Sequence, residues 1–172
     1  MLHELNKIVA WDNYDQICLN APVHDAANHQ AGQGDLYYDW DRSEQVWNEE
    51  EGTYNWIVPP RENPMSEEDF VVTTECFRNT VFDTLLHDLT SAYSVGRVRI
   101  MKLAPKTCLT WHKDNTKRIH YPLKTHEGCL MIIGDEVRHM PENTWWLTDT
   151  LHDHTAINAS TEPRLHIVAC VL

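Results

Sequence analysis

The chain has 172 residues, with 42% hydrophobic and 23% charged side chains, and this length and composition are typical of one globular domain. Its formal net charge of −12 argues against a general affinity for the phosphate backbone of nucleic acids. The mean hydropathy is −0.50, and no apolar run approaches the roughly 18 residues that a membrane span requires.

Two features of the sequence predict a cytoplasmic protein. Within residues 1–11, the only apolar stretch is interrupted by His3, Glu4 and Lys7, so we expect no signal peptide there. The five cysteines are scattered, odd in number and without a Cys-x-x-Cys pair, which indicates neither a disulfide framework nor a cysteine zinc site. We therefore expect reduced thiols and a cytoplasmic location.

The first part of the chain carries no clear periodic pattern. Residues 1–65 are irregular, with turn residues at positions 20–22, 32–34 and 59–60. Residues 35–51 are acidic and aromatic. One interpretation of this stretch is a solvated loop with a few packed rings. The alternative is a segment that covers a substrate, because long loops over a rigid scaffold often carry function.

One packing helix is predicted in the middle of the chain. Ser66 and Asp69 resemble a capping box, and Thr73 or Thr74 offers a second start. Apolar residues then recur at helical spacing on one face until shortly before Gly96. They are Phe77, Val81, Phe82, Leu85, Leu86 and Leu89. Nothing in this helix suggests chemistry.

From residue 97 onward the pattern changes to short strands. Turn residues separate five segments that are rich in β-branched and aromatic side chains, which is typical of a sandwich or barrel. The segments are residues 98–103, 119–121, 129–133, 144–147 and 165–172. We expect a mainly β protein, a double-stranded β-helix (jelly roll) with one or more supporting helices. Residues 1–172 would form a single domain, with 1–95 as supporting strands, loops and helix and 96–172 as the jelly-roll core.

A candidate metal site begins at His112 and Asp114. Residues two apart face the same side of a strand, so this imidazole and this carboxylate can converge on one point. Together they form two thirds of the facial triad that holds non-haem Fe(II). Residues 149–154 offer two candidates for the third ligand, His152 and His154, and the spacing alone leaves both open.

Two arginines in the last part of the chain suggest an anion site. Arg164 follows His154 by ten residues and opens the final strand, where a buried guanidinium needs an anionic partner. It therefore has the character of a clamp for a carboxylated cosubstrate. Arg118 and His120, again two residues apart, supply further donors on one face of a preceding strand.

These residues carry a resemblance to a known family. The matching stretches are residues 105–107 before His112, residues 118–120, Glu142 twelve residues before His154, and residues 154–158 and 164–166. In these stretches the sequence resembles the aspartyl/asparaginyl β-hydroxylase-like branch of the Fe(II)/2-oxoglutarate-dependent dioxygenases. Bacterial free-proline hydroxylases are related to that branch.

The resemblance implies a metal centre and selects its third ligand. His112 and His154 correspond to the two iron-binding imidazoles, and Asp114 corresponds to the carboxylate ligand. The family spacings before and after the second histidine select His154 over His152. The cofactors implied are Fe(II), 2-oxoglutarate as cosubstrate, and O2.

The resemblance also implies where 2-oxoglutarate lies. Arg164 corresponds to the residue that pairs with its distal carboxylate, and Arg118 and His120 correspond to additional contacts. For His166, which follows two residues later, a packed and hydrogen-bonded core histidine is favoured over a substrate contact.

The function implied is hydroxylation of a C–H bond of an amino acid or a peptide or protein side chain, with release of succinate and CO2. The partner is then a small-molecule or peptide substrate, without nucleic acid or membrane. Two alternatives stay open: a cupin-like metallo-enzyme that does not use 2-oxoglutarate, and a non-catalytic jelly-roll binding module. The sequence predicts neither the identity of the substrate nor the oligomeric state.

Overall fold

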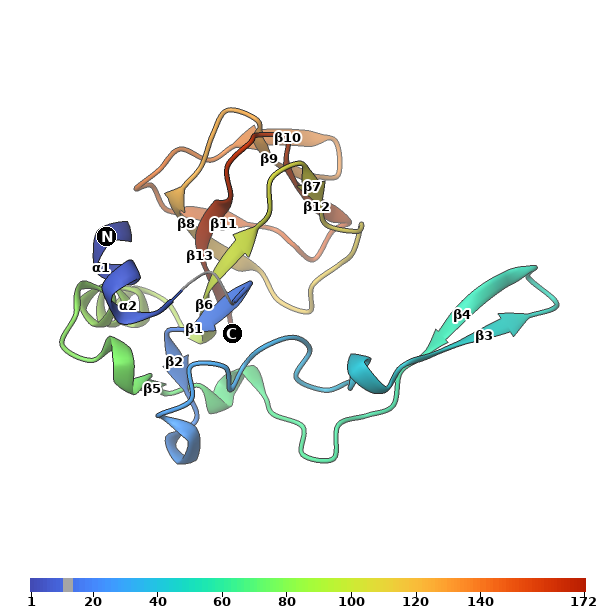
Figure 1. Ribbon diagram of the computed structural model, residues 1–172, viewed down its shortest axis with the longest axis horizontal. Coiled ribbons are helices and arrows are strands. Elements are labelled where there is room, and N and C mark those ends of the chain that lie inside the picture. Colours follow the sequence, from blue (N-terminus) through green and yellow to red (C-terminus); the bar gives the residue numbers. More distant parts are fainter. Residues whose placement is uncertain (11–13) are drawn as a thin grey trace.

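The computed structural model describes residues 1–10 and 14–172, and Figure 1 shows them as two sheets with helices packed on one side. The helices are α1 (Leu2–Ile8) and α2 (Val81–Ala92). The strands are β1 (Gln16–Cys18), β2 (Asn20–Ala21), β3 (Glu44–Asn48), β4 (Thr53–Ile57), β5 (Val72–Thr73), β6 (Val95–Leu103), β7 (Thr107–Cys108), β8 (Arg118–Lys124), β9 (Cys129–Ile133), β10 (Glu136–His139), β11 (Trp146–Thr148), β12 (His154–Asn158) and β13 (Arg164–Val171).

Two antiparallel sheets form the main body. The major sheet has the order β1-β6-β13-β8-β11, and the minor sheet has the order β10-β9-β12-β7. From β6 onward the chain passes back and forth between the sheets, because β6, β8, β11 and β13 belong to the major sheet and the intervening strands belong to the minor sheet. This alternation is the winding of a double-stranded β-helix. The predicted fold class is confirmed.

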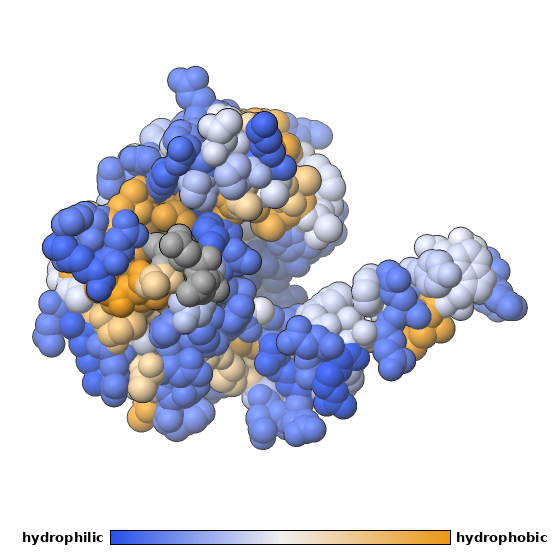
Figure 2. Space-filling view, viewed as in Figure 1, coloured by the Kyte–Doolittle hydropathy of each residue, from blue (hydrophilic) through white to orange (hydrophobic). Residues whose placement is uncertain are grey.

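The first 65 residues are more ordered than the irregular sequence suggests. β1 adds to the edge of the major sheet beside β6, and β2 pairs with β5. β3 and β4 form a two-stranded hairpin that projects away from the two sheets (Figure 1) and stands clear of the rest of the surface (Figure 2). Its rings pair with one another, as Trp47 does with Tyr54, and stay exposed to solvent. The solvated interpretation therefore fits the hairpin.

The supporting helix begins later than the sequence signals predict. The Ser66–Asp69 capping box exists, but it caps only a short 3-10 turn over Glu67–Asp69. β5 follows, and its pairing with β2 uses the residues that were expected to open the helix. α2 starts at Val81, where the Thr80 side chain accepts a hydrogen bond from the Phe82 N–H. No helix among the described residues has the length and apolar character to cross a bilayer.

The outer face of the major sheet carries the principal hydrophobic core. Alternate residues of the three central strands, including Val98, Ile119 and Ile167, pack against α1 and α2. Leu5 of α1 and Phe82 of α2 are completely buried in this cluster. The apolar stripe predicted for the helix thus lies against the apolar alternation predicted for the strands.

The inner face of the same sheet, which faces the minor sheet, is strongly polar. Six of the side chains that alternate with the core residues on β6, β8 and β13 are buried cationic or imidazole groups. They are Arg97, Arg99, Arg118, His120, Arg164 and His166. The apolar cluster that shares this inner space is small and centres on Leu103, Met131, Met140 and Ala156. The space between the sheets is therefore lined by buried cationic and imidazole groups beside this small apolar cluster.

The N-terminus of α2 generates a prediction about pH. Asp83 accepts hydrogen bonds from the Thr73 hydroxyl (2.6 Å) and the Asn79 N–H (2.9 Å), and these bonds lower the pKa of its carboxyl below the usual 3.8. A carboxyl with a lowered folded-state pKa stabilises the protein above its unfolded pKa and loses that contribution as the pH falls through the folded pKa. We expect Asp83→Asn to lower the free energy of unfolding by about 0.5–1 kcal/mol at pH 7.

The same loss should disappear in acid. Urea unfolding at pH 7 and at a pH well below 3.8 measures the difference between wild type and Asp83→Asn. Asp88→Asn, an exposed change further along the same helix, is the control and should shift stability by less than about 0.5 kcal/mol. A difference for Asp83→Asn that persists unchanged in acid contradicts the prediction.

Candidate metal centre

Backbone pairing brings His112 and His154 side by side. His154 opens β12, and His112 lies in the segment between β7 and β8, where the two residues form an isolated antiparallel bridge. The His112 N–H donates to the His154 carbonyl (3.1 Å), and the His154 N–H donates to the His112 carbonyl (2.9 Å). Their ring centroids are 4.2 Å apart. Two residues that are 42 positions apart in the chain thus present their imidazoles from one backbone unit.

The same nitrogen of each ring is occupied by a backbone carbonyl. Nδ1 of His112 lies 2.8 Å from the Thr110 carbonyl oxygen, and Nδ1 of His154 lies 2.9 Å from the His152 carbonyl oxygen. A carbonyl oxygen only accepts hydrogen bonds, so each neutral ring carries its proton on Nδ1. The Nε2 lone pairs of both rings are then available to a metal ion.

Asp114 supplies an oxygen to the same place. Its N–H donates to the Thr150 carbonyl (2.9 Å), which anchors the residue two positions after His112. Its Oδ2 lies 3.6 Å from Nε2 of His154, and its Oδ1 pairs with the Arg118 guanidinium at 3.0 Å. One donor atom each from His112, Asp114 and His154 lie within 4.8 Å of one another, close enough for all three to hold a single ion.

The structure thus brings together the three residues that the sequence proposed as ligands. His152, the alternative to His154, is exposed and contributes its backbone carbonyl to the cluster through the His154 ring. Arg118 lies beside the cluster, where its guanidinium also donates to the Thr116 side chain. Its ion pair with Asp114 fixes the orientation of that carboxylate.

A second cluster of buried polar groups lies on the inner face of the major sheet. Arg164 and His166 come from β13 and His120 comes from β8, and the His120 and His166 ring centroids are 5.7 Å apart. Among the described residues, Nε of Arg164 and both ring nitrogens of each histidine have no hydrogen-bond partner. Unpaired buried polar atoms are costly, so this cluster is arranged for a ligand that satisfies them.

Burial determines the charge of this second cluster. Desolvation, together with the positive charges of Arg164 and Arg118, lowers the pKa of His120 to about 3. Desolvation and the Arg164 charge also hold the pKa of His166 well below its ordinary value. Desolvation lowers the pKa of Arg164 to about 10, so at neutral pH one guanidinium cation stands among two neutral imidazoles. Such a group attracts an anion and donates hydrogen bonds to it.

A cavity of about 520 Å³ opens beside His112, Asp114 and Arg118. Its other walls come from β6, through Arg97 and Arg99, and from the N-terminal segment. That segment contributes the residues Gly34, Asp35, Leu36, Tyr37 and Trp40. The start of the acidic and aromatic stretch therefore lies over the candidate metal centre, whereas its later part forms the projecting hairpin.

Sequence reasoning missed three inner-face residues of this region. His166 was interpreted as a hydrogen-bonded core histidine, but its ring nitrogens have no partner among the described residues. Arg97 and Arg99 were not singled out. The sequence did contain a pattern that indicates the two arginines. Charged and apolar residues alternate through β6, where Val98 follows Arg97 and Ile100 follows Arg99.

The sequence profile of the family described as "Aspartyl/Asparaginyl beta-hydroxylase" matches residues 13–172. The chain belongs to the aspartyl/asparaginyl β-hydroxylase family. The resemblance identified from the residues is confirmed. Among curated proteins, this family member is similar to L-proline cis-4-hydroxylase of Rhizobium meliloti (strain 1021), with 28% identity over 131 residues. The alignment covers 68% of this chain and 47% of the relative, so the chain spans about half the length of that relative.

Solved structures overlap with this hydroxylase-family chain only in part. A cupin domain from Bordetella pertussis Tohama I covers 44% of this chain and 80% of its own, with 15% identity and a TM-score of 0.39. The overlap with a predicted oxalate decarboxylase from Thermotoga maritima covers 52% of this chain and 72% of the decarboxylase chain, with 17% identity and a TM-score of 0.40. Overlap of this extent carries no argument about activity.

The geometry predicts a metal affinity that depends on three side chains. We expect the metal-free protein to bind one Co(II) ion per chain in anaerobic calorimetric titration. His154→Ala or Asp114→Ala should weaken binding by at least 10- to 100-fold, because each removes one of three donors. His152→Ala is the matched control, since its side chain is exposed and its backbone carbonyl is retained. Equal losses in His152→Ala and His154→Ala would contradict the assignment.

Proposed function

We propose that this chain is an Fe(II)/2-oxoglutarate-dependent dioxygenase that hydroxylates a C–H bond of an amino acid or of a peptide or protein side chain. The observation that carries the proposal is the donor set. Two imidazoles with free Nε2 atoms and one carboxylate converge, which is the facial arrangement used for non-haem Fe(II). His112, Asp114 and His154 would be the iron ligands.

The unpaired inner-face cluster fits 2-oxoglutarate. This cosubstrate is a dianion, and Arg164 presents a buried guanidinium whose Nε lacks a partner among the described residues. We assign Arg164 to the distal carboxylate, with His120 and His166 donating from neutral rings. Arg118 stays a predicted further contact, and its ion pair with Asp114 brings its guanidinium next to the metal ligands.

Iron(II) with 2-oxoglutarate and O2 would supply the oxidant that converts a C–H bond into C–OH while releasing succinate and CO2. The residues of the chain bind and orient. The Thr110 and His152 carbonyls hold the two imidazoles in their metal-binding tautomer. The cavity beside Asp114 would receive the substrate.

Anaerobic addition of Fe(II) and 2-oxoglutarate tests the proposal. The chelate of these two gives a weak visible charge-transfer band, which we expect in the folded protein and not in His154→Ala. Admission of air should then release succinate. A folded, metal-loaded protein that shows neither the band nor succinate contradicts the proposal, and turnover of another substrate without succinate would favour the cupin-like alternative.

The role of Arg164 can be measured separately. Loss of a charged hydrogen bond to a bound carboxylate weakens binding by about 10- to 100-fold. We therefore expect Arg164→Met to raise the KM for 2-oxoglutarate by this factor, with a smaller effect on kcat. Arg138→Met, on the exposed strand β10, is the matched control and should leave this KM within about twofold. An unchanged KM in Arg164→Met contradicts the assignment.

A further inference from the structure

Arg99 is a buried cation that forms no ion pair with any of the described residues. Its side chain projects from β6 onto the inner face of the major sheet and is 8% exposed. One terminal nitrogen donates to the neutral Gln16 side chain (2.7 Å), and Nε has no partner among the described residues. A buried guanidinium is normally paired with an anion, because desolvation of an uncompensated charge is costly.

Glu67, whose negative charge acts on Arg99, is already engaged by another arginine. Glu67 binds Arg97 through both oxygens, at 2.9 Å to the terminal nitrogen and 3.2 Å to Nε. Arg97 also donates to the carbonyls of Gly32 (2.6 Å) and Gly34 (2.9 Å), so its guanidinium is fully committed. Of the two neighbouring arginines, Arg97 is neutralised by Glu67, and Arg99 has no carboxylate bound to it among the described residues. Burial and the neighbouring Arg97 charge lower its pKa to about 10, which leaves it protonated at neutral pH.

The backbone fixes this arrangement. A Cβ atom added at Gly96 would lie 2.5 Å from the Glu67 carbonyl oxygen, so only glycine permits the short 3-10 turn that carries Glu67 to lie against β6. Glu67 is therefore held at Arg97, one side-chain position before Arg99 on the same face of the strand. The carboxylate neutralises one guanidinium and is not free to move to the other.

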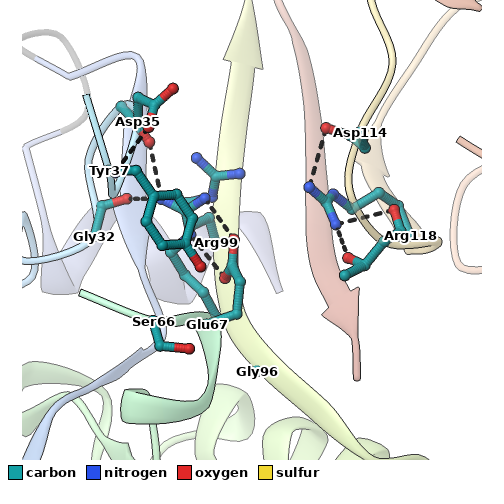
Figure 3. A network of polar contacts seen from close by, with 12 residues as sticks. Gly32, Asp35, Tyr37, Ser66, Glu67, Gly96, Arg99, Asp114 and Arg118 are labelled. Atoms are coloured by element: carbon teal, nitrogen blue, oxygen red, sulfur yellow. Dashed lines mark hydrogen bonds and ion pairs between the residues drawn. The ribbon is translucent and has the colours of Figure 1, made fainter. Parts of the chain in front are cut away.

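Arg99 lines the cavity beside the candidate metal centre. In Figure 3, Arg99 and Glu67 lie on one side of the view, and the Asp114–Arg118 ion pair lies on the other. The cavity wall includes four cationic side chains, those of Arg97, Arg99, Lys113 and Arg118, and three carboxylates, those of Asp35, Glu67 and Asp114. In a chain with a net charge of −12, this wall carries an excess of positive charge.

The position of Arg99 separates it from the proposed 2-oxoglutarate site. Arg164 pairs with Leu103 across β13 and β6, and Leu103 lies four residues beyond Arg99 on β6. At about 3.3 Å per residue, this places the two arginines about 13 Å apart along the sheet. Arg99 lines the cavity beside the candidate metal centre and Arg164 does not, so the inner face offers guanidinium groups at two different places. The metal-ligand residues His112 and Asp114 lie at the wall of the Arg99 cavity.

We propose that Arg99 binds a carboxylate of the substrate, and that the substrate is accordingly a small free carboxylate of the amino-acid class. This inference rests on the proposed function and specifies what its cavity receives. An internal residue of a peptide can offer Arg99 a carboxylate only when it is Asp or Glu, whereas every free amino acid carries one. The 520 Å³ cavity has the size of a small-molecule site. Leu36, Tyr37 and Trp40 form the apolar part of its wall, against which the hydrocarbon part of the substrate packs.

Pairs of free L-amino acids and their carboxamides test the inference, because each pair differs in the charge of one group. We measure the dissociation constant of each compound for the metal-free protein by calorimetry and its KM for stimulated succinate release by the iron-loaded protein. At least one amino acid should bind and stimulate release. Its carboxamide should have a dissociation constant and KM about 10- to 100-fold higher.

Arg99→Met assigns this preference to the residue. The variant should raise both constants of the amino acid by about 10- to 100-fold and leave those of the carboxamide within about twofold, so that the preference for the acid disappears. Arg99→Lys should restore part of it. Arg78→Met, an exposed arginine outside the cavity, is the control with an unchanged preference. Circular dichroism measures whether each variant folds. If Arg99→Met does not fold, the acid and carboxamide constants of wild type and of Arg99→Lys are compared instead.

The outcomes separate the two proposals. Three results overturn the Arg99 inference and leave the proposed function standing. They are equal binding of acids and carboxamides, a preference for the acid that survives in Arg99→Met, and no response to any amino acid in a protein that shows the 2-oxoglutarate band. Absence of the band and of succinate, with the acid preference still measured by calorimetry in the metal-free protein, overturns the proposed function and leaves Arg99 as a carboxylate site.

Discussion

The major sheet is covered on both faces, by α1 and α2 on one side and by the minor sheet on the other, and the two faces carry opposite chemistry. The outer face is apolar and holds the principal core, with Val98, Ile119 and Ile167 at its centre. Since that core supplies most of the hydrophobic burial, the inner face does not have to. Charged and imidazole side chains can then occupy the interior, where their unpaired atoms favour the binding of anions.

The minor sheet positions the side chains of the candidate metal centre. The bridge between His112 and His154 uses backbone hydrogen bonds to place two side chains, and neighbouring carbonyls orient both rings. Both steps use hydrogen bonds within the chain. These bonds order the donor atoms and so reduce the part of the binding free energy that is spent on ordering them. Preorganisation of this type is what a metal centre with few protein ligands requires.

Much of the fold follows from local patterns, and the parts that do not follow depend on pairing between distant segments. β9 has the predicted bounds, and β6, β8, β11 and β13 were located to within a few residues, because alternation is a local property. The later start of α2 arises from the pairing of β5 with β2, which lies more than 50 residues earlier. The His112 and Asp114 pair was visible from spacing, whereas Arg99 gains its meaning only from Glu67 being engaged by Arg97. The likeness to known relatives, rather than spacing, selected His154 over His152.

The alternation along β6, β8 and β13 also places recognition and core packing on opposite faces of the same strands. Substitution of an inner residue changes what the protein recognises and leaves the helix-facing core intact, so specificity can diverge at little cost in stability. Insertion or deletion of a single residue has the opposite character. In β13 it would exchange the two faces, turning Ile167 toward the ligand and His166 toward the helices. Away from the register shifts already present at the ends of β13, these strands should tolerate a change of inner side chain more readily than a change of length.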